Sequence, residues 1–248
     1  MNSNAENVSL GLRLRRGLMR RLGRMLYQLL GRVEIRGLEN IPRGMPYLAA
    51  INHTSIFDAP LVLGFWPESI AAIGAADVFE KPVQGQIVSL YGTTRVHRGM
   101  YDRALIDDML QLLRAGTPVL IAPEGGRSHQ PAMRRAKPGI AYIVEEAKVP
   151  VVPVGVLGAT DDFLKRGLRL RRPRIGMRVG KPFELPPLEG RGEARREARQ
   201  YNADLVMLRI AELLPAEYHG VYAGLSAPPP ALQSTKEEST KHESNKDG

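Results

Sequence analysis

Cysteine is absent from the 248 residues of this chain. Disulfide bridges, thiolate zinc sites and a cysteine nucleophile are therefore excluded, and the absence is compatible with a reducing compartment. With 43% hydrophobic residues, a chain of this length can bury the core of one α/β domain or of two small ones. We expect one domain with attachments.

Long hydrophobic runs are missing as well. The longest reach only about eight residues, whereas a helix needs about 20 to cross a bilayer, so we expect no membrane-spanning segment. Basic residues near the N-terminus occur without the continuous apolar core and small-residue cleavage site of a secretory signal. We therefore expect no such signal.

Acidic residues are missing from two strongly basic stretches. Residues 8–32 carry seven arginines and no acid, and residues 165–181 carry eight Arg or Lys and no acid. The whole chain has a formal net charge of +9 and an isoelectric point near 10.0. This charge calls for an anionic partner, which is nucleic acid, an anionic membrane surface or a phosphorylated substrate.

Residues 12–30 have the periodicity of an amphipathic helix. Apolar residues recur along one side, at Leu18, Leu22, Met25 and Leu29. Arginines follow the same period on the other side, at Arg13, Arg16, Arg20 and Arg24. We expect residues 1–31 to form a basic helix in a membrane interface, with its apolar face down and its guanidinium groups among lipid phosphates. The alternative is an amphipathic helix that only covers the domain.

From residue 32 onward, short apolar runs alternate with helical patterns. The expected strands are residues 33–37, 46–51, 69–74, 94–98, 118–123, 149–156 and 174–180. The expected helices are residues 59–65, a stretch ending near residue 90, and residues 101–114, 139–148 and 192–213. Such βα units predict an α/β fold with a mixed, mainly parallel central sheet flanked by helices. A ligand site should lie beyond the carboxyl ends of the strands.

The expected domain covers residues 32–220. The tail at residues 226–248 is rich in proline and then strongly polar, without an aromatic residue. Such a composition buries too little apolar surface to fold, so we expect the tail to be disordered.

A histidine followed five places later by an aspartate occurs three times: at His53–Asp58, His97–Asp102 and His242–Asp247. The last of these falls in the polar tail. The first lies between an expected strand and a helix started by Pro60. There the carboxylate can bond Nδ1 of His53, fix its tautomer and stabilise the imidazolium that forms when Nε2 accepts a proton. The alternative is that Asp58 only caps the helix.

The second pair has similar surroundings but contains Arg98, next to the histidine. A neighbouring cation disfavours the protonated imidazole and weakens the histidine as a base at neutral pH. Arg98 is therefore the informative residue in that segment.

A second polar loop, PEGGRSH at residues 123–129, also follows an expected strand. Its glycines, Gly125 and Gly126, allow positive φ and close backbone approach. Glu124 can accept hydrogen bonds from hydroxyls, and Arg127 can bind a phosphate through two parallel hydrogen bonds. Lys137 and the start of the next expected helix offer further contacts to an anion.

Several common catalytic motifs are absent. Ser128 does not fit the G-x-S-x-G nucleophile elbow, because Gln130 stands where the second glycine is needed. Walker A, HExxH and GxGxxG sequences do not occur.

Taken in order, four segments resemble the motif blocks of the glycerolphosphate and lysophosphatidic acid acyltransferase superfamily. They are NHTSIFD (52–58), GTTRVHR (92–98), PEGGRS (123–128) and VPVVPV (149–154). Their order and spacing match that family over residues 35–180, which is about 60% of the chain. The resemblance implies a fold of the glycerol-3-phosphate acyltransferase type.

The resemblance also implies a reaction. A fatty acyl group would pass from acyl-CoA or acyl carrier protein to the hydroxyl of a lysophosphatidic acid-type acceptor, in phospholipid biosynthesis. His53 would remove the proton of that hydroxyl and Asp58 would orient His53, without a covalent enzyme intermediate. Implied contacts to the acceptor are Arg98, Glu124, Gly125, Gly126, Arg127, Ser128 and Lys137. Pro153 belongs to the fourth block, which is tied to donor binding or structure.

The expected partners follow from this reaction. They are a membrane lipid acceptor, the acyl-CoA or acyl carrier protein donor, and an anionic membrane surface, with no nucleic acid. The resemblance implies no metal and no cofactor besides the acyl donor. It places the protein at the cytoplasmic face of the membrane, as a peripheral or monotopic member.

The third block departs from the family pattern, because Gly126 replaces its usual threonine. The lost hydroxyl leaves the acceptor open between lysophosphatidic acid and another hydroxylated lipid, such as a different lysophospholipid or lyso-ornithine lipid. Two other functions also stay open. One is a basic membrane- or nucleic-acid-binding protein with an inactive acyltransferase domain, and the other is a lipid hydrolase that uses water as the acceptor.

Overall fold

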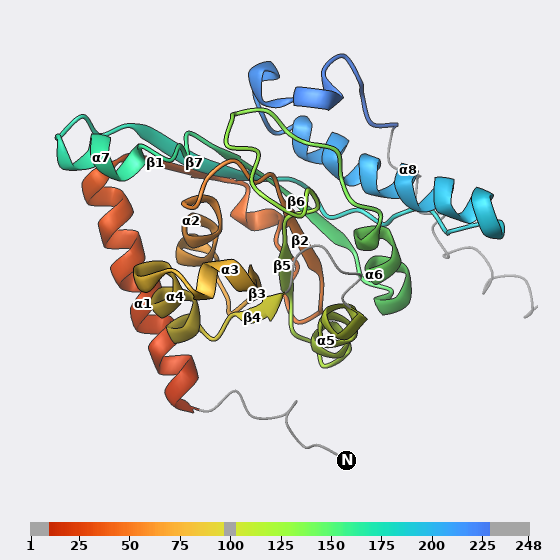
Figure 1. Ribbon diagram of the computed structural model, residues 1–248, viewed down its shortest axis with the longest axis horizontal. Coiled ribbons are helices and arrows are strands. Elements are labelled where there is room, and N and C mark those ends of the chain that lie inside the picture. Colours follow the sequence, from red (N-terminus) through yellow and green to blue (C-terminus); the bar gives the residue numbers. More distant parts are fainter. Residues whose placement is uncertain (1–9, 97–102, 229–248) are drawn as a thin grey trace, which may run out of the picture.

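The computed structural model describes residues 10–96 and 103–228. In this part of the chain, a seven-stranded sheet has the order β1-β7-β6-β2-β5-β3-β4 (Figure 1). The strands are β1 (Arg32–Arg36), β2 (Leu48–Ile51), β3 (Ala71–Ala75), β4 (Thr94–Val96), β5 (Val119–Ile121), β6 (Val151–Leu157) and β7 (Arg174–Val179). All neighbours pair in parallel except β6 and β7, which are antiparallel. The predicted α/β fold with a mixed, mainly parallel sheet is confirmed.

The helices are α1 (Leu10–Leu30), α2 (Asp58–Phe65), α3 (Ala76–Phe79), α4 (Pro82–Tyr91), α5 (Arg103–Arg114), α6 (Gly139–Ala147), α7 (Phe163–Leu168) and α8 (Gly192–Ala211). Three short 3-10 turns, η1 (Leu38–Asn40), η2 (Ala216–Tyr218) and η3 (Gly220–Tyr222), complete the described elements. Most lie where the sequence predicts them. Helix α7 is an exception, because it forms inside a basic stretch for which the sequence predicted only a strand.

The hydrophobic core lies on both faces of the sheet. All four residues of β2 are buried, because alternate side chains point to opposite faces and both faces are covered. Leu48 and Ala50 pack in one cluster with α5, α6 and α8. Ala49 and Ile51 pack in the other with α1, α2 and α7 (Figure 1). The two-sided covering explains the uninterrupted apolar runs in the sequence.

Helix α1 turns its arginines toward the protein. The guanidinium of Arg16 is buried and donates hydrogen bonds to the carbonyls of Tyr91, at 2.8 Å, and Gly92, at 3.1 Å, at the end of α4. Arg20 and Arg24 donate to carbonyls at the end of α2. Helix C-termini carry unpaired carbonyls and partial negative charge, which suits cations. The expectation that these three arginines lie among lipid phosphates is therefore wrong.

The apolar side of α1 faces outward instead. Its large exposed side chains are Leu14, Leu18, Leu22, Met25, Leu26 and Leu29. Helix α1 runs along one side of the molecule, against α2 and α4 (Figure 1). We call this set of six residues the α1 stripe. Within the described residues, no helix combines the length and the hydropathy required to cross a membrane.

The expected disordered tail, residues 226–248, falls almost entirely outside the described residues.

Candidate functional site

The loops of the candidate site follow three central strands of the sheet. Strands β6, β2 and β5 are parallel neighbours, so their carboxyl ends meet at one edge of the sheet. Asn52 follows β2 directly and is fully buried. Its amide donates to the carbonyl of Val156 at 2.9 Å and accepts from the amide of Val156 at 2.7 Å. This double contact fixes the chain where it leaves β2, one residue before His53.

His53 and Asp58 are in direct contact. Nδ1 of His53 lies 3.0 Å from Oδ2 of Asp58, and the same oxygen accepts hydrogen bonds from the amides of Thr54 at 2.7 Å and Ser55 at 2.8 Å. These amides precede α2, so the carboxylate orders the turn and does not cap the helix. A carboxylate only accepts, so Nδ1 carries the hydrogen and the lone pair of Nε2 can take a proton.

The environments of the two side chains differ. Asp58 is fully buried, whereas the side chain of His53 is 20% exposed. Burial raises the pKa of Asp58, and the hydrogen bonds from His53, Ser55 and Thr54 act in the opposite direction. A shielded carboxylate behind an accessible imidazole is the arrangement in which the carboxylate orients a general base.

Glu124 connects the first motif block, NHTSIFD (52–58), with the third, PEGGRS (123–128). We call the loop that begins with the third block the third-motif loop. Its buried carboxylate accepts a hydrogen bond from the amide of His53 through Oε1 and one from the amide of Arg134 through Oε2, both at 2.8 Å. The amide of Ser128 donates to the carbonyl of His53 at 2.9 Å. The expected role of Glu124 was to accept hydrogen bonds from acceptor hydroxyls. Its hydrogen bonds in the structure are to backbone amides, which makes it a residue that positions the loop.

Gly125 and Lys137 depend on each other. Gly125 has a φ of +67°, and a Cβ there would lie only 2.7 to 3.0 Å from Cε, Cδ and Nζ of Lys137. The amide of Lys137 donates to the carbonyl of Pro123 at 2.9 Å. The lysine side chain therefore lies directly on the glycine, as part of the same loop. A glycine is required for the backbone conformation and for the close approach.

Arg127 is held beside the His53 turn by Asp161. Its Nη1 lies 3.7 Å from Oδ1 of Asp161, which also accepts from the amide of Ile56 at 3.4 Å. Oδ2 of Asp161 lies 3.4 Å from Nδ1 of His129. Partial burial raises the pKa of Asp161, but hydrogen bonds from Ser55, His129 and Ile56 and the charge of Arg127 outweigh it and leave this pKa lowered. Sequence reasoning missed Asp161, although it follows β6 at the edge where the other loops gather.

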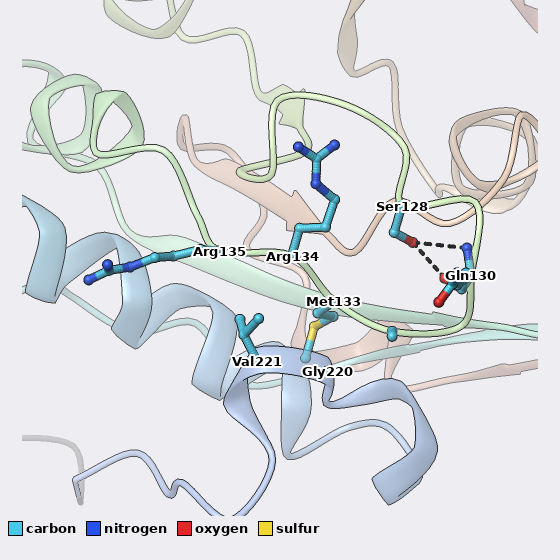
Figure 2. A pocket seen from close by; sticks show the side chains of 8 residues that line it. Ser128, Gln130, Met133, Arg134, Arg135, Gly220 and Val221 are labelled. Atoms are coloured by element: carbon cyan, nitrogen blue, oxygen red, sulfur yellow. Dashed lines mark hydrogen bonds between the residues drawn. The ribbon is translucent and has the colours of Figure 1, made fainter.

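A shallow pocket lies between the end of the third-motif loop and η3 (Figure 2). Figure 2 shows the hydroxyl of Ser128 bonded to the backbone of Gln130, to which it donates and from which it accepts. Arg134 and Arg135 point away from each other, and Arg135 lies 3.3 Å from Asp204 of α8. These two arginines, which the sequence did not single out, extend the positive charge of the loop.

The Acyltransferase family model matches residues 32–157, just over half of the chain. The chain belongs to the Acyltransferase family. The match ends with β6, so Asp161, α7, β7 and α8 lie outside the segment that defines the family.

Relatives of this acyltransferase-family chain carry more specific names. It is 28% identical over 164 residues to the 1-acyl-sn-glycerol-3-phosphate acyltransferase alpha of Ovis aries, covering 65% of this chain and 55% of that protein. It is 31% identical over 131 residues to the chloroplastic 1-acyl-sn-glycerol-3-phosphate acyltransferase BAT2 of Brassica napus, covering 51% of this chain and 38% of that one. The aligned part thus spans about half or less of these relatives.

A solved structure shares the fold. The crystal structure of the 1-acyl-sn-glycerophosphate acyltransferase PlsC from Thermotoga maritima aligns with a TM-score of 0.57 at 22% identity. The alignment covers 80% of this chain and 79% of that one.

Two further expectations about the site concern Arg98 and a metal ion. Arg98, expected to contact the acceptor, lies outside the described residues. Among residues 10–96 and 103–228, no group of three or more His, Asp or Glu side chains is placed to hold a metal ion.

Proposed function

We propose that this protein is an O-acyltransferase that moves a fatty acyl group from an acyl thioester to the hydroxyl of a lysophosphatidic acid-type acceptor. The contact between Nδ1 of His53 and Asp58 carries the proposal, because it leaves Nε2 as a base at the carboxyl end of β2. Membership of the Acyltransferase family and the names of the relatives support the same reaction. Phospholipid biosynthesis is the process that uses this reaction.

The proposed mechanism needs one general base. Nε2 of His53 takes the proton of the acceptor hydroxyl as its oxygen attacks the thioester carbonyl. The tetrahedral intermediate collapses, the carbon–sulfur bond breaks, and the imidazolium returns the proton to the leaving thiolate. The products are an ester and a free thiol. Asp58 stabilises the imidazolium during the reaction, because its negative charge lies 3.0 Å from Nδ1.

The phosphate of the acceptor is assigned to Arg127 and Lys137. Both belong to the loop that Glu124 attaches to the amide of His53. In the structure, Arg127 pairs with the half-exposed Asp161. A phosphate dianion would compete with this carboxylate for the guanidinium, since Arg binds phosphate through two parallel hydrogen bonds.

Gly126 bears on the choice of acceptor. Gly125 has a positive φ and Gly126 does not, so the backbone conformation at residue 126 is one that a threonine can adopt. A threonine hydroxyl there would add one hydrogen-bonding group close to Arg127. We therefore expect Gly126→Thr to change the ranking of acceptors and to leave the fold intact.

The membrane part of the proposal rests on the α1 stripe. It presents six large apolar side chains on the outer side of a helix that three inward arginines hold to the domain. An exposed apolar helix face suits peripheral binding in a membrane interface, where the acceptor lipid resides. The face proposed is the cytoplasmic one, where acyl-CoA and acyl carrier protein occur.

The test is a thiol-release assay on the full chain. Acyl-CoA or acyl carrier protein serves as the donor, against glycerol 3-phosphate, lysophosphatidic acid, other lysophospholipids and lyso-ornithine lipid. We expect thiol release that requires a lysophospholipid acceptor and is lost in His53→Ala. Near wild-type turnover in His53→Ala would overturn the mechanism.

The two other functions give different results in the same assay. Release of free fatty acid without any acceptor would indicate a hydrolase. Binding to vesicles without thioester consumption would indicate a non-catalytic membrane-binding protein.

A further inference from the structure

Helix α7 and the turn after it expose apolar side chains that nothing in the proposed reaction uses. Leu164, Leu168 and Leu170 are 41%, 69% and 88% exposed. Leu170 has a φ of +57°, a conformation that a bulky residue rarely adopts. A large apolar side chain held almost fully in water at such a position is unfavourable for an isolated protein. Its presence points to a partner that covers it.

The inner side of the same helix fixes which way these leucines point. Phe163 is buried. The centroid of its ring lies 5.5 Å from that of Tyr27 in α1 and 5.4 Å from that of Phe57, in the turn between His53 and Asp58. One helical turn later, a Cβ on Gly167 would lie 2.7 Å from Cβ of Leu30. Helix α7 is therefore anchored on its inner side, and Leu164 and Leu168 cannot turn inward.

The exposed leucines of α7 lie on a helix that contacts α1. Helix α7 packs against the C-terminal end of α1, where the α1 stripe ends at Leu29 (Figure 1). The segment after α7 is also bonded to α1, because the guanidinium of Arg172 donates a hydrogen bond to the carbonyl of Gln28 at 2.9 Å. Two elements about 140 residues apart in the sequence thus present apolar side chains at the same end of the molecule.

The chain that carries the α7 leucines is rich in positive charge. Residues 163–183 contain no Asp or Glu. The exposed or partly exposed cations of α7 and of the segment up to the start of β7 are Lys165, Arg166, Arg169, Arg171, Arg172 and Arg174. In the part of the chain that the structure describes, none of the six forms an ion pair. Leucines among unpaired cations complement an anionic lipid surface, which offers both hydrocarbon and phosphate.

We infer that residues 164–172 form a second contact with an anionic phospholipid bilayer, in addition to the α1 stripe. Two contacts fix the orientation of the domain on the surface, which a single helix does not. The inference rests on the proposed function, in which the acceptor lipid comes from a membrane. We call residues 164–172 the α7 contact.

Both membrane contacts adjoin residues that bond to the turn between His53 and Asp58. Asp161, just before α7, holds Arg127 and the amide of Ile56. The hydroxyl of Tyr27, from α1, donates to the carbonyl of Phe57 at 2.8 Å. Both membrane contacts therefore adjoin the segment between His53 and Asp58, so docking through them places the site beside the lipid surface.

The test is co-sedimentation of the full chain with vesicles of phosphatidylcholine alone or mixed with phosphatidylglycerol. The first variant is Leu168→Asn with Leu170→Asn, because asparagine tolerates the positive φ at residue 170. We expect it to weaken binding to the mixed vesicles about tenfold or more, since it removes two apolar side chains from the interface. The matched control is Leu225→Asn, a leucine that is 59% exposed elsewhere on the surface, and it should bind like wild type.

A second variant, Arg169→Gln with Arg171→Gln, tests the charge. It should remove about tenfold or more of the preference for anionic vesicles, because each cation near such a surface contributes about 1 kcal/mol. All variants should show wild-type thermal unfolding, since the exchanged side chains are exposed. Binding of the Leu168 and Leu170 variant that equals wild type would overturn the inference.

Activity separates this inference from the proposed function. With a short-chain, water-soluble lysophosphatidic acid, the Leu168 and Leu170 variant should turn over like wild type, while its rate on acceptor embedded in vesicles should fall about tenfold. Absence of acyl transfer in the wild type, together with variant-sensitive vesicle binding, would reject the proposed function and keep the α7 contact. Equal rates of wild type and variant on embedded acceptor would reject the α7 contact and keep the function.

Discussion

The backbone amide of His53 donates a hydrogen bond to the buried carboxylate of Glu124 at 2.8 Å, across 71 residues of sequence. This bond attaches the loop that carries Arg127 to the turn that carries the imidazole. The proposed proton acceptor, His53, and the proposed phosphate-binding cation, Arg127, thereby belong to one hydrogen-bonded unit at the carboxyl ends of β2 and β5. Such fixed spacing is what positions an acceptor hydroxyl when the phosphate of the same molecule is bound.

Glu124 gives a pH-dependent prediction. Burial holds its pKa above the ordinary value of 4.5, against the opposing hydrogen bonds from the amides of Arg134 and His53. The unfolded chain returns to the ordinary value, so above it the folded state binds more protons than the unfolded one. The stability that this raised pKa contributes is fully present below pH 4.5. It is lost as the pH rises through the pKa of Glu124 in the folded state.

Glu124→Gln removes this titration. The free energy of unfolding of wild type minus that of the variant should therefore decrease as the pH rises above 4.5. Urea denaturation at several pH values measures this difference. A difference that stays constant or grows with pH would contradict the prediction.

The catalytic pair gives a kinetic prediction. His53→Ala should lower thiol release by about 100- to 10,000-fold, because positioned general bases contribute this much. Asp58→Asn should lower it by about 100-fold or more, because the amide lacks the charge that stabilises the imidazolium. Circular dichroism and thermal unfolding report whether the fold is kept. If the His53 variant is folded and its rate falls less than tenfold, His53 is not the base.

Arg127 and Asp161 should have opposite effects on the acceptor. Arg127→Ala should raise the KM for a phosphate-bearing acceptor about 10- to 100-fold with a smaller change in kcat, because a charge-assisted hydrogen bond contributes about 1.5–3 kcal/mol. Asp161→Asn should lower that KM, because it removes the carboxylate that competes for the guanidinium. Steady-state kinetics at fixed donor measures both. A higher KM in Asp161→Asn would show that the carboxylate positions Arg127 and does not compete.

Arg16 and Arg15 form a matched pair on α1. The guanidinium of Arg16 is buried, bonded to the carbonyls of Tyr91 and Gly92, and 5.0 Å from the ring of Tyr91. Arg16→Ala should lower the free energy of unfolding by about 2–4 kcal/mol, through lost charge-assisted hydrogen bonds and packing. Arg15 is exposed, so Arg15→Ala should change it by less than about 0.5 kcal/mol. Equal effects in urea denaturation would refute the inward orientation of Arg16.

Gly125→Ala tests the third-motif loop. A Cβ at this position would meet the side chain of Lys137 and sit on a backbone with positive φ. We expect a loss of about 1–2 kcal/mol in the free energy of unfolding and a raised acceptor KM, because Lys137 has to move. Gly116→Ala is the control: its φ is also positive, but its Cβ meets nothing within 4 Å. It should lose stability without any change in KM.

Part of the fold follows from local pattern. Short apolar runs separated by helical segments predicted the strands near residues 48, 119 and 151, because strands buried on both faces need apolar residues throughout. The pattern could not reveal α7. Its six residues form less than two helical turns, and their inward positions, Phe163 and Gly167, are recognisable only from the residues they touch.

The candidate site divides in the same way. His53 and Asp58 are close because a strand-to-helix turn joins them, and the apolar run before His53 and the helix started by Pro60 predicted that turn. The pairing of Arg127 with Asp161 depends on β5 and β6 lying on either side of β2. Strand order is set by packing across the whole sheet, so the sequence spacing of these two residues carried no sign of their contact.

Helix α1 shows what the sequence alone determined and what only the tertiary structure decided. The 3.6-residue periodicity determined that the helix has an apolar side and an arginine side. It did not determine which side meets the protein. The ends of α2 and α4 decide it, because their unpaired carbonyls lie under α1 and accept hydrogen bonds from Arg16, Arg20 and Arg24. The apolar stripe is thereby left facing outward.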